Sequence, residues 1–299
     1  MHRAHLSVAV AALLLAALAV RPAAAQRLAE PPESDLALVS VNALIGAASA
    51  GVVALIRGED VTDALAAGAL GGAMSFGGRR LAVVDVPAAG LLGRQIAAIG
   101  HGLVVDGGRG APLLSEIWLP VGPAQVRVPS PRADGVGGWD ARLDLMSTGA
   151  IVYAAVQPEF EVDWSASAST GSPVFRAPRH RMYVDEKQVG GVALLGTVML
   201  AANANDAMLD HEVVHVIQTD FIATAWSYPA EDWLRGLVGA DQPWMNRFVI
   251  GAAAPLTGGL IYLATGEVPF VQKWMETEAY SLARHRNEAS GRLRPIAGP

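Results

Sequence analysis

The chain contains no cysteine in its 299 residues, and this absence removes several classes of site. Without thiols there is no disulfide framework, no catalytic thiolate and no cysteine-ligated metal. Charged residues are also scarce, at 17%, whereas 52% of the residues are hydrophobic. Such a composition excludes a disordered, highly solvated chain and supplies enough apolar surface for a large core. Any metal that this protein binds must therefore be held by histidine and carboxylate side chains.

Basic residues are few as well. Lysine and arginine total 22 against 28 aspartates and glutamates, which gives a formal net charge of −6, and the only lysines are Lys187 and Lys273. A nucleic-acid-binding surface needs clustered cations that neutralise phosphates. The charge balance therefore argues against a nucleic-acid partner.

Residues 1–25 have the pattern of a signal peptide. A short basic start with Arg3 precedes a long apolar run from Leu6 to Val20, and Ala23 to Ala25 are the small residues of a signal-peptidase site. A membrane-anchoring first helix is the alternative interpretation. Cleavage before Gln26 predicts an exported protein that is periplasmic or associated with an envelope membrane.

Residues 26–110 are rich in alanine and glycine, and we expect them to be helical. Leu36 to Ile56 carries no charge and is long enough to cross a bilayer as a helix. Its small residues suit close helix packing equally well, so a membrane span and a buried helical layer both remain open. Gly77 to Arg80 is expected to break the pattern, and Leu91 to Val105 fits either a helix or a buried strand.

Residues 111–202 change to the alternation of apolar and polar side chains that is typical of strands. Ile117 to Val121 and Ala124 to Val128 show this alternation, and proline and glycine clusters separate such segments. We therefore expect an antiparallel β-rich region. The serine-rich stretch 165–173 lacks the elbow of a nucleophilic serine and is expected to be a solvated loop. Val189 to Ala202 fits a hairpin with one buried strand.

A long helix is predicted at the start of the last region, 203–299. Asn205 or Asp206 offers a side-chain cap, and the residues that follow contain neither glycine nor proline as far as Trp226. This helix carries the most informative motif of the chain, H-E-V-V-H, which begins at His211.

The motif places two imidazoles on one face of the helix. Residues four apart lie one turn apart on the same face, so His211 and His215 can bind one metal. Glu212 lies about 100° around the helix from His211. From there its carboxylate can reach a water molecule at the metal instead of the metal itself.

A catalytic zinc site needs a third protein ligand and one open position. The last predicted helix, Pro269 to Ala289, offers Glu276 and Glu278 for this role. Glu278 lies within an apolar stripe, where a carboxylate must be paired or metal-bound, so periodicity slightly favours it. Glu276 shares the adjoining face with Ala279 and Ala283, whose small side chains permit another helix to come close. The stripe consists of Val271, Trp274, Met275 and Leu282.

The H-E-V-V-H motif and the E-T-E-A-Y sequence that begins at Glu276 together resemble the gluzincin metallopeptidases in which E-x-x-A-D supplies the third ligand. The first glutamate of that pattern binds zinc and corresponds to Glu276, and Ala279 matches the alanine. Tyr280 stands where the pattern has aspartate. The resemblance therefore leaves the orientation of a ligand histidine to another residue, and we expect Asp210 or Gln218 to provide it.

The resemblance covers residues 205–290 and implies a catalytic zinc site. Zn²⁺ held by His211, His215 and Glu276 would activate water, and Glu212 would act as general base in the cleavage of a polypeptide substrate. Candidate donors to the developing oxyanion are Tyr280, Tyr262 and His285. The histidines outside this region, His101 and His180, are expected to be surface or core residues.

The segment Phe248 to Thr265 is uncharged and separates the motif from the third ligand. In some membrane-embedded relatives of the gluzincins, hydrophobic helices occupy this place. The segment fits a buried or re-entrant segment and a membrane-apposed hairpin, and the second alternative predicts membrane association through 36–56 and 248–265. Aromatic residues before the segment fit interfacial anchors or core residues: Trp226, Tyr228, Trp233 and Trp244.

The sequence therefore predicts an α+β protein: a signal peptide (1–25), an Ala/Gly-rich helical region (26–110), an antiparallel β-rich region (111–202) and a helical, zincin-like subdomain (203–299). The expected function is zinc-dependent peptide-bond hydrolysis in the cell envelope. An alternative is a non-catalytic envelope structural or assembly protein with a structural zinc or a degenerate peptidase scaffold. A third is an integral membrane protein of another activity.

Overall fold

The computed structural model describes residues 34–128, 139–180, 182–184, 187–238, 247–249 and 270–289. The predicted signal peptide (1–25) and nearly all of the apolar segment 248–265 lie outside the described residues, as do Tyr262 and Trp244. The side chains of Trp226, Tyr228, Trp233 and His285 lie outside the description too.

Helices and strands follow one another in the predicted α+β order, with helices first and strands in the middle. They are α3 (Asp35–Arg57), α4 (Val61–Ala82), α5 (Ala89–Arg109), β1 (Ile117–Val121), β2 (Ala124–Val128), β3 (Asp140–Asp144), α6 (Leu145–Val156), β4 (Glu161–Val162), α7 (Trp164–Thr170), β5 (Val174–Arg176), β6 (Met182–Val184), β7 (Lys187–Val189), β8 (Gly191–Leu194), β9 (Thr197–Leu200), α8 (Asp206–Val238), β10 (Phe248–Val249) and α10 (Phe270–Ala289). The segment Leu91 to Val105, which fitted a helix or a strand, belongs to α5.

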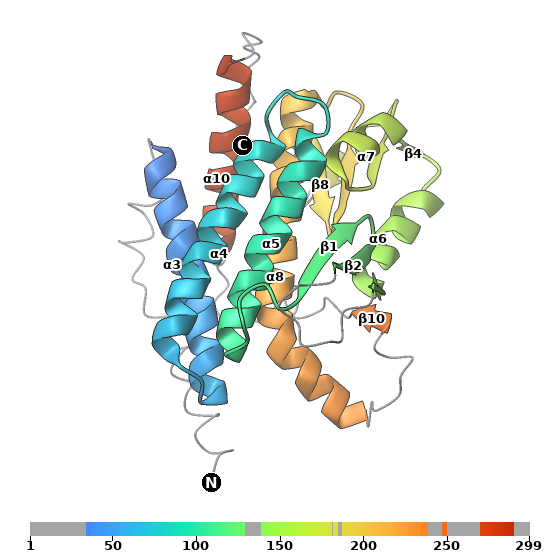
Figure 1. The fold of residues 1–299 in the computed structure, drawn as a ribbon. Coiled ribbons are helices and arrows are strands. Elements are labelled where there is room, and N and C mark those ends of the chain that lie inside the picture. Colours follow the sequence, from blue (N-terminus) through green and yellow to red (C-terminus); the bar gives the residue numbers. More distant parts are fainter. Residues whose placement is uncertain are drawn as a thin grey trace.

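Helices α3, α4 and α5 lie side by side (Figure 1). Ser34 and Asp60 accept backbone hydrogen bonds in the first turns of α3 and α4, which satisfies N–H groups that have no partner within the helix. The two helices approach closely at Gly46 and Gly68, where a Cβ on either residue would collide with the backbone of the other. The small residues of this region therefore permit close helix packing.

The expected break at Gly77 to Arg80 is wrong, because α4 continues to Ala82. Gly78 packs so closely against Gly93 of α5 that no Cβ would fit between them. The Arg79 side chain is buried, with 1% of its surface exposed. Gly78 thus brings two helices together, and neither glycine of this turn ends α4.

Helix α3 is the one helix among the described residues that is long and apolar enough to cross a membrane, judged by length and composition. Only 33% of its most apolar window is buried within the molecule. Leu36, Leu44 and Leu55 are exposed on its surface. A signal sequence and a membrane span both meet this criterion, so membrane association through 36–56 stays a prediction.

Helices α3, α4 and α5 form a helical bundle. Two four-stranded sheets follow it in the chain, in the orders β1-β2-β3-β10 and β4-β5-β9-β8. Most neighbouring strands are antiparallel, as predicted, and the parallel pairs are β5–β9 and β3–β10. The hairpin expected over Val189 to Ala202 is confirmed as β8 and β9, and every residue of β9 is buried. Among the described residues, β8 is an edge strand of its sheet.

The serine-rich stretch 165–173 corrects another expectation, because most of it is helix α7 and not a loop. Asp163 caps this helix by accepting a hydrogen bond of 3.0 Å from the Ala166 backbone N–H. Gly171 ends it in the left-handed conformation, with φ of 69°. Local capping at both ends therefore outweighs the weak helix propensity of serine.

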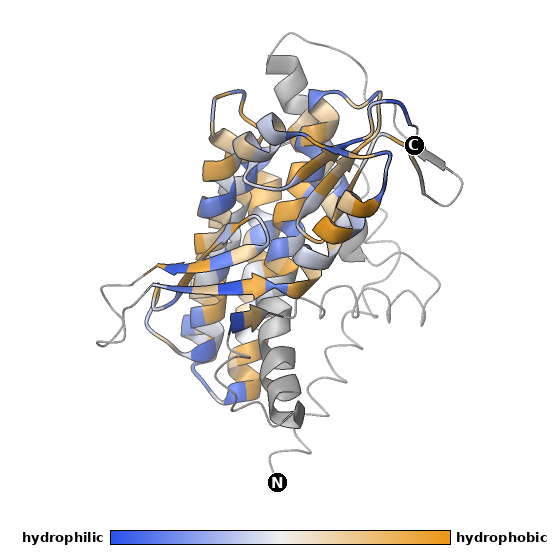
Figure 2. Ribbon diagram, turned by 90° about the vertical axis from the view of Figure 1, so that its right-hand side faces the viewer, coloured by the Kyte–Doolittle hydropathy of each residue, from blue (hydrophilic) through white to orange (hydrophobic). Residues whose placement is uncertain are grey.

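Helix α8 packs against α3, α4, α5 and α10 and also against β8 and β9. Val213, Val216 and Ile217 join the core formed with the strands, whereas Val214 joins a core that includes Trp274 of α10. Apolar residues recur in helices and strands alike (Figure 2). Because α8 is covered from several directions, its H-E-V-V-H segment is held between the helical bundle and the sheet.

Candidate metal centre

The two histidines of H-E-V-V-H face one another across one turn of α8. The side chain of Asn205 accepts a hydrogen bond of 3.0 Å from the Met208 backbone N–H at the start of this helix, so the predicted cap is confirmed. The Nε2 atoms of His211 and His215 lie 3.0 Å apart. The four-residue spacing has thus brought both imidazoles to one point.

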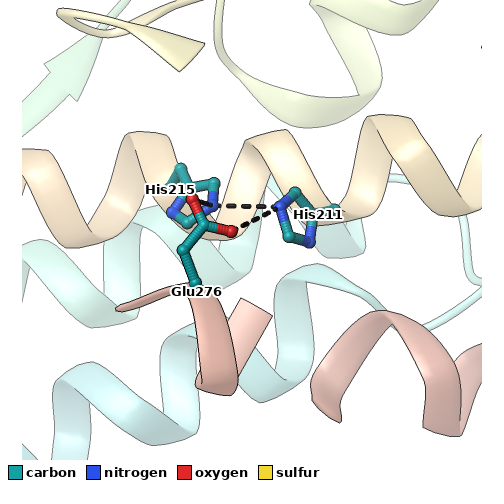
Figure 3. A group of neighbouring side chains, drawn as sticks. All are labelled: His211, His215 and Glu276. Carbon is teal, nitrogen blue, oxygen red and sulfur yellow. Dashed lines mark hydrogen bonds and ion pairs between the residues drawn. The ribbon is translucent and has the colours of Figure 1, made fainter. Parts of the chain in front are cut away.

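The carboxylate of Glu276 reaches this point from α10 (Figure 3). One of its oxygens lies 3.4 Å from Nε2 of His211, and the other lies 3.4 Å from Nε2 of His215. These three side chains can hold a metal ion. Bonds of about 2.0–2.1 Å at tetrahedral angles would separate ligand atoms by about 3.3 Å, which fits the observed distances. Glu276 is 50% exposed, so this side of the group is open to solvent.

The charges of the three side chains influence their protonation. Burial would raise the pKa of Glu276, but hydrogen bonds and charge interactions with both histidines lower it well below its ordinary value. Burial lowers the pKa of His211. Burial also acts to lower the pKa of His215, but its interactions with Glu276 and Glu212 outweigh burial and raise it. A metal ion at this point competes mainly with the proton of His215.

Glu212 lies beside this group and next to strand β8. Its side chain is only 5% exposed, and it accepts a backbone hydrogen bond from Ala193 of β8. A Cβ on Gly191 would lie 2.8 Å from Cγ of Glu212, so the absence of a side chain there makes room for the glutamate. Burial raises the pKa of Glu212 to about 7, with His215 lowering it and Glu276 raising it further. This carboxyl group can therefore accept and release a proton near neutral pH.

Gln218 orients His215, and it is one of the two residues that were expected to orient a ligand histidine. Its Oε1 lies 2.9 Å from Nδ1 of His215, and its Nε2 donates to Oε2 of Glu278 (2.8 Å) and to the Met275 carbonyl (3.2 Å). Asp210, the other candidate, is buried in α8. Within the described part of the chain, Nδ1 of His211 is buried and has no hydrogen-bond partner.

Glu278, which periodicity favoured as the third ligand, is engaged elsewhere. Its Oε1 accepts hydrogen bonds from Nε of Arg79 (3.1 Å) and Nδ2 of Asn42 (3.2 Å). The stripe correctly predicted a buried carboxylate that needs a partner, and the partner is an arginine from α4. The sequence interpretation did not identify Arg79 and Asn42 as partners of Glu278. The only signal in the sequence is that each is a polar residue inside an Ala/Gly-rich helix.

The remaining candidates divide between the site and the rest of the molecule. The ring of Tyr280 lies against His211, with centroids 4.4 Å apart. Burial and the charges of Glu276 and Glu212 raise the pKa of Tyr280, which therefore keeps its hydroxyl proton. His101 is buried in the bundle and His180 is exposed, so both are core or surface residues as expected.

Comparison with protein-family models, with curated proteins and with solved structures finds no match to this chain.

Proposed function

We propose that this protein is a zinc-dependent peptidase in which His211, His215 and Glu276 hold the metal and Glu212 is the general base. One observation carries the proposal: three potential ligand atoms converge at distances that fit zinc, and the buried carboxyl group of Glu212 lies beside them. Metal-assisted hydrolysis of a peptide bond uses this pairing of a metal with a base.

The donor set supports zinc. Two imidazoles and one carboxylate form one of the common sets of protein ligands at catalytic zinc, and they leave the fourth position for water or substrate. The half-exposed Glu276 is consistent with such an accessible position. Bound zinc supplies Lewis-acid chemistry, since it polarises a carbonyl oxygen and acidifies water.

Glu212 moves the proton. Its carboxylate would take a proton from the attacking water and deliver it to the leaving amine, and the burial that raises the pKa of Glu212 suits a group that both accepts and releases a proton. The cationic charge of bound metal favours the ionised form, so the base is available when the site is loaded.

Tyr280 contributes a hydroxyl donor to the oxygen that becomes negatively charged during attack. Its position against His211 and its raised pKa both support this role. Loss of one such donor commonly lowers kcat by about 100- to 1000-fold. Tyr280→Phe is expected to show a loss of this kind while zinc binding is retained.

Strand β8 supports a peptide as the substrate. It is an edge strand among the described residues, and Gly191 and Ala193 place it directly beside Glu212. An extended peptide can add to such an edge through backbone hydrogen bonds, which binds many sequences by the same groups. The scissile carbonyl would then lie near the base and the metal ligands.

The test compares wild type, Glu212→Gln and Glu161→Gln, which replaces an exposed glutamate of β4. Zinc content per chain and cleavage of a mixed peptide library, read by mass spectrometry, are measured on each protein. We expect about one zinc in all three. Cleavage should occur with wild type and Glu161→Gln and be lost in Glu212→Gln. Zinc binding without cleavage by the wild type would favour a structural zinc and contradict the proposal, as would cleavage that survives Glu212→Gln.

A further inference from the structure

We propose that the buried Arg79–Glu278 ion pair fixes the hydrogen-bond direction of Gln218 and thereby holds His215 in the tautomer whose unprotonated Nε2 faces the metal site. The inference rests on the proposed function for its purpose, although the tautomer itself can be measured without metal. Arg79, Glu278 and Gln218 are positioning residues in this account, because none of them belongs to the cluster of metal ligands.

The ion pair lies in the interior. The side chains of Arg79 and Glu278 are each 1% exposed, and their Nε and Oε1 atoms are 3.1 Å apart. Taking two charges out of water carries a large desolvation cost, so such a pair is weak support for stability alone. Orientation of Gln218, which contacts His215, is a role that can explain why this pair is present.

The pair makes Glu278 an acceptor at both oxygens. Oε1 receives hydrogen bonds from Arg79 and Asn42, and Oε2 receives one from Nε2 of Gln218. A carboxylate beside a guanidinium carries no proton to donate. The group of Gln218 that faces Glu278 must therefore be its NH₂.

This requirement fixes the amide of Gln218 completely. Its second N–H is directed at the Met275 carbonyl, which also can only accept (3.2 Å). With both N–H groups assigned, Oε1 must be the atom 2.9 Å from Nδ1 of His215. Since Oε1 can only accept, Nδ1 of His215 carries a hydrogen, and in the neutral imidazole Nε2 keeps the lone pair that is directed at His211 and Glu276.

The arginine is itself held by the N-terminal bundle. Nη1 of Arg79 donates to Oγ of Ser75 (2.7 Å), Nη2 donates to Oδ1 of Asn42, and Oγ of Ser75 lies 3.1 Å from Nε2 of His101. The path therefore runs from α5 through α4 and α3 to α10 and α8. It gives the Ala/Gly-rich bundle a direct part in arranging the metal centre.

The first test measures zinc affinity by competition with a chromophoric chelator. In Glu278→Gln the amide oxygen still accepts from Arg79 and Asn42, so the amide turns its NH₂ toward Gln218. Gln218 then loses its acceptor there, and the direction of its hydrogen bonds is no longer fixed. Loss of such support commonly weakens metal binding about 10- to 100-fold, and we expect a rise in Kd in this range. The matched control is Asp220→Asn, which alters the carboxylate 2.9 Å from the buried Arg94 and leaves Gln218 untouched. Equal Kd values for the two variants and wild type would overturn the inference.

A double variant keeps the net charge of the interior and restores a fixed direction to the hydrogen bonds of His215 and of residues 218 and 278. In Gln218→Glu with Glu278→Gln, the new carboxylate accepts from His215 and the new amide donates to that carboxylate. We expect the double variant to regain part of the affinity that Glu278→Gln loses, because the N–H that Gln218 gives to the Met275 carbonyl is not restored. Such non-additivity is expected only of directly coupled residues. Additive losses would overturn the inference.

The tautomer is read directly from nitrogen chemical shifts of isotope-labelled histidine in metal-free protein at about pH 9, where imidazole is neutral. The wild type should show His215 protonated at Nδ1 only, and Glu278→Gln should show a mixture. A wild type protonated at Nε2 would contradict the inference whether or not zinc binds. Conversely, the expected tautomer in a protein that binds no zinc would refute the proposed function and leave the positioning network intact.

Discussion

Glu212→Gln should make the metal-free protein more stable while it abolishes catalysis. Glu212 is 5% exposed, and burial raises its pKa from 4.5 to about 7. Between these two pH values the folded protein retains a proton that the unfolded chain has released. Stability therefore falls as pH rises through this interval and stays lower above it. Glutamine fills nearly the same space without this ionisation.

The expected gain follows from the size of the shift. A change of about 2.5 pKa units corresponds to about 3 kcal/mol, at roughly 1.4 kcal/mol per unit. This is an increase of about 5 °C in the unfolding midpoint for a chain of 299 residues, at roughly 2.1 cal/mol/K of unfolding entropy per residue. The assay is thermal and urea unfolding of chelator-treated wild type and Glu212→Gln at about pH 4 and pH 8, below and above both pKa values. The gain should be present at the higher pH and absent at the lower.

The exposed Glu161 provides the control, because Glu161→Gln should leave stability unchanged at both pH values. The reasoning is refuted if Glu212→Gln is no more stable than wild type at the higher pH, or if its gain is the same at both. A gain in stability when a candidate catalytic carboxyl group is replaced by an amide is the usual signature of a residue retained for function.

Three further predictions concern the site and the bundle. Zinc affinity should fall about tenfold per pH unit below the raised pKa of His215, because one proton must leave His215 before zinc binds. Titration calorimetry in two buffers with different ionisation enthalpies would report that proton. A pH-independent affinity would contradict the ligand assignment. Gly191→Ala should displace Glu212, whose Cγ lies 2.8 Å from the new Cβ, and lower kcat with zinc retained; unchanged kcat would show that β8 does not constrain the base. Gly46→Ala should destabilise the bundle by about 1–3 kcal/mol. Gly77→Ala, where nothing lies within 4 Å, should stabilise α4 by about 0.5–1 kcal/mol, and equal denaturation midpoints for the two would refute the packing argument.

The local parts of the structure follow well from the sequence. The cap at Asn205, the helix through H-E-V-V-H and the four-residue spacing of His211 and His215 depend only on neighbouring residues. Similarly, the hairpin over Val189 to Ala202 is encoded by its own alternation and glycines. Periodicity is sufficient wherever the partner of a residue is the adjacent turn or strand.

The choice between Glu276 and Glu278 shows the limit of what helical periodicity can predict. A helical wheel correctly identifies Glu278 as the buried residue of the pair, but a buried carboxylate can be compensated by a cation from any part of the chain. The compensating residue is Arg79, which is 199 positions away in the sequence. The resemblance of E-T-E-A-Y to E-x-x-A-D had pointed to Glu276, whereas periodicity alone could not distinguish the paired carboxylate from the one beside the histidines; the tertiary packing of α4 against α8 and α10 does so.

The errors in the helical regions have a common cause. Gly77, Gly78 and the serines of α7 have low helix propensity. Close packing of Gly78 on Gly93 and capping by Asp163 and Gly171 override that propensity. Propensity therefore failed where tertiary contacts and caps supply the stability.

The central claim is that His211, His215 and Glu276 bind one zinc ion, and anomalous diffraction at the zinc absorption edge tests it most directly. Crystals of the wild type grown with zinc should show a single strong anomalous peak at about 2.0–2.2 Å from Nε2 of each histidine and from a Glu276 oxygen. The same measurement on Glu276→Gln should show the peak weakened or absent. A wild type without a peak at this place, or with its zinc on other residues, would contradict the account.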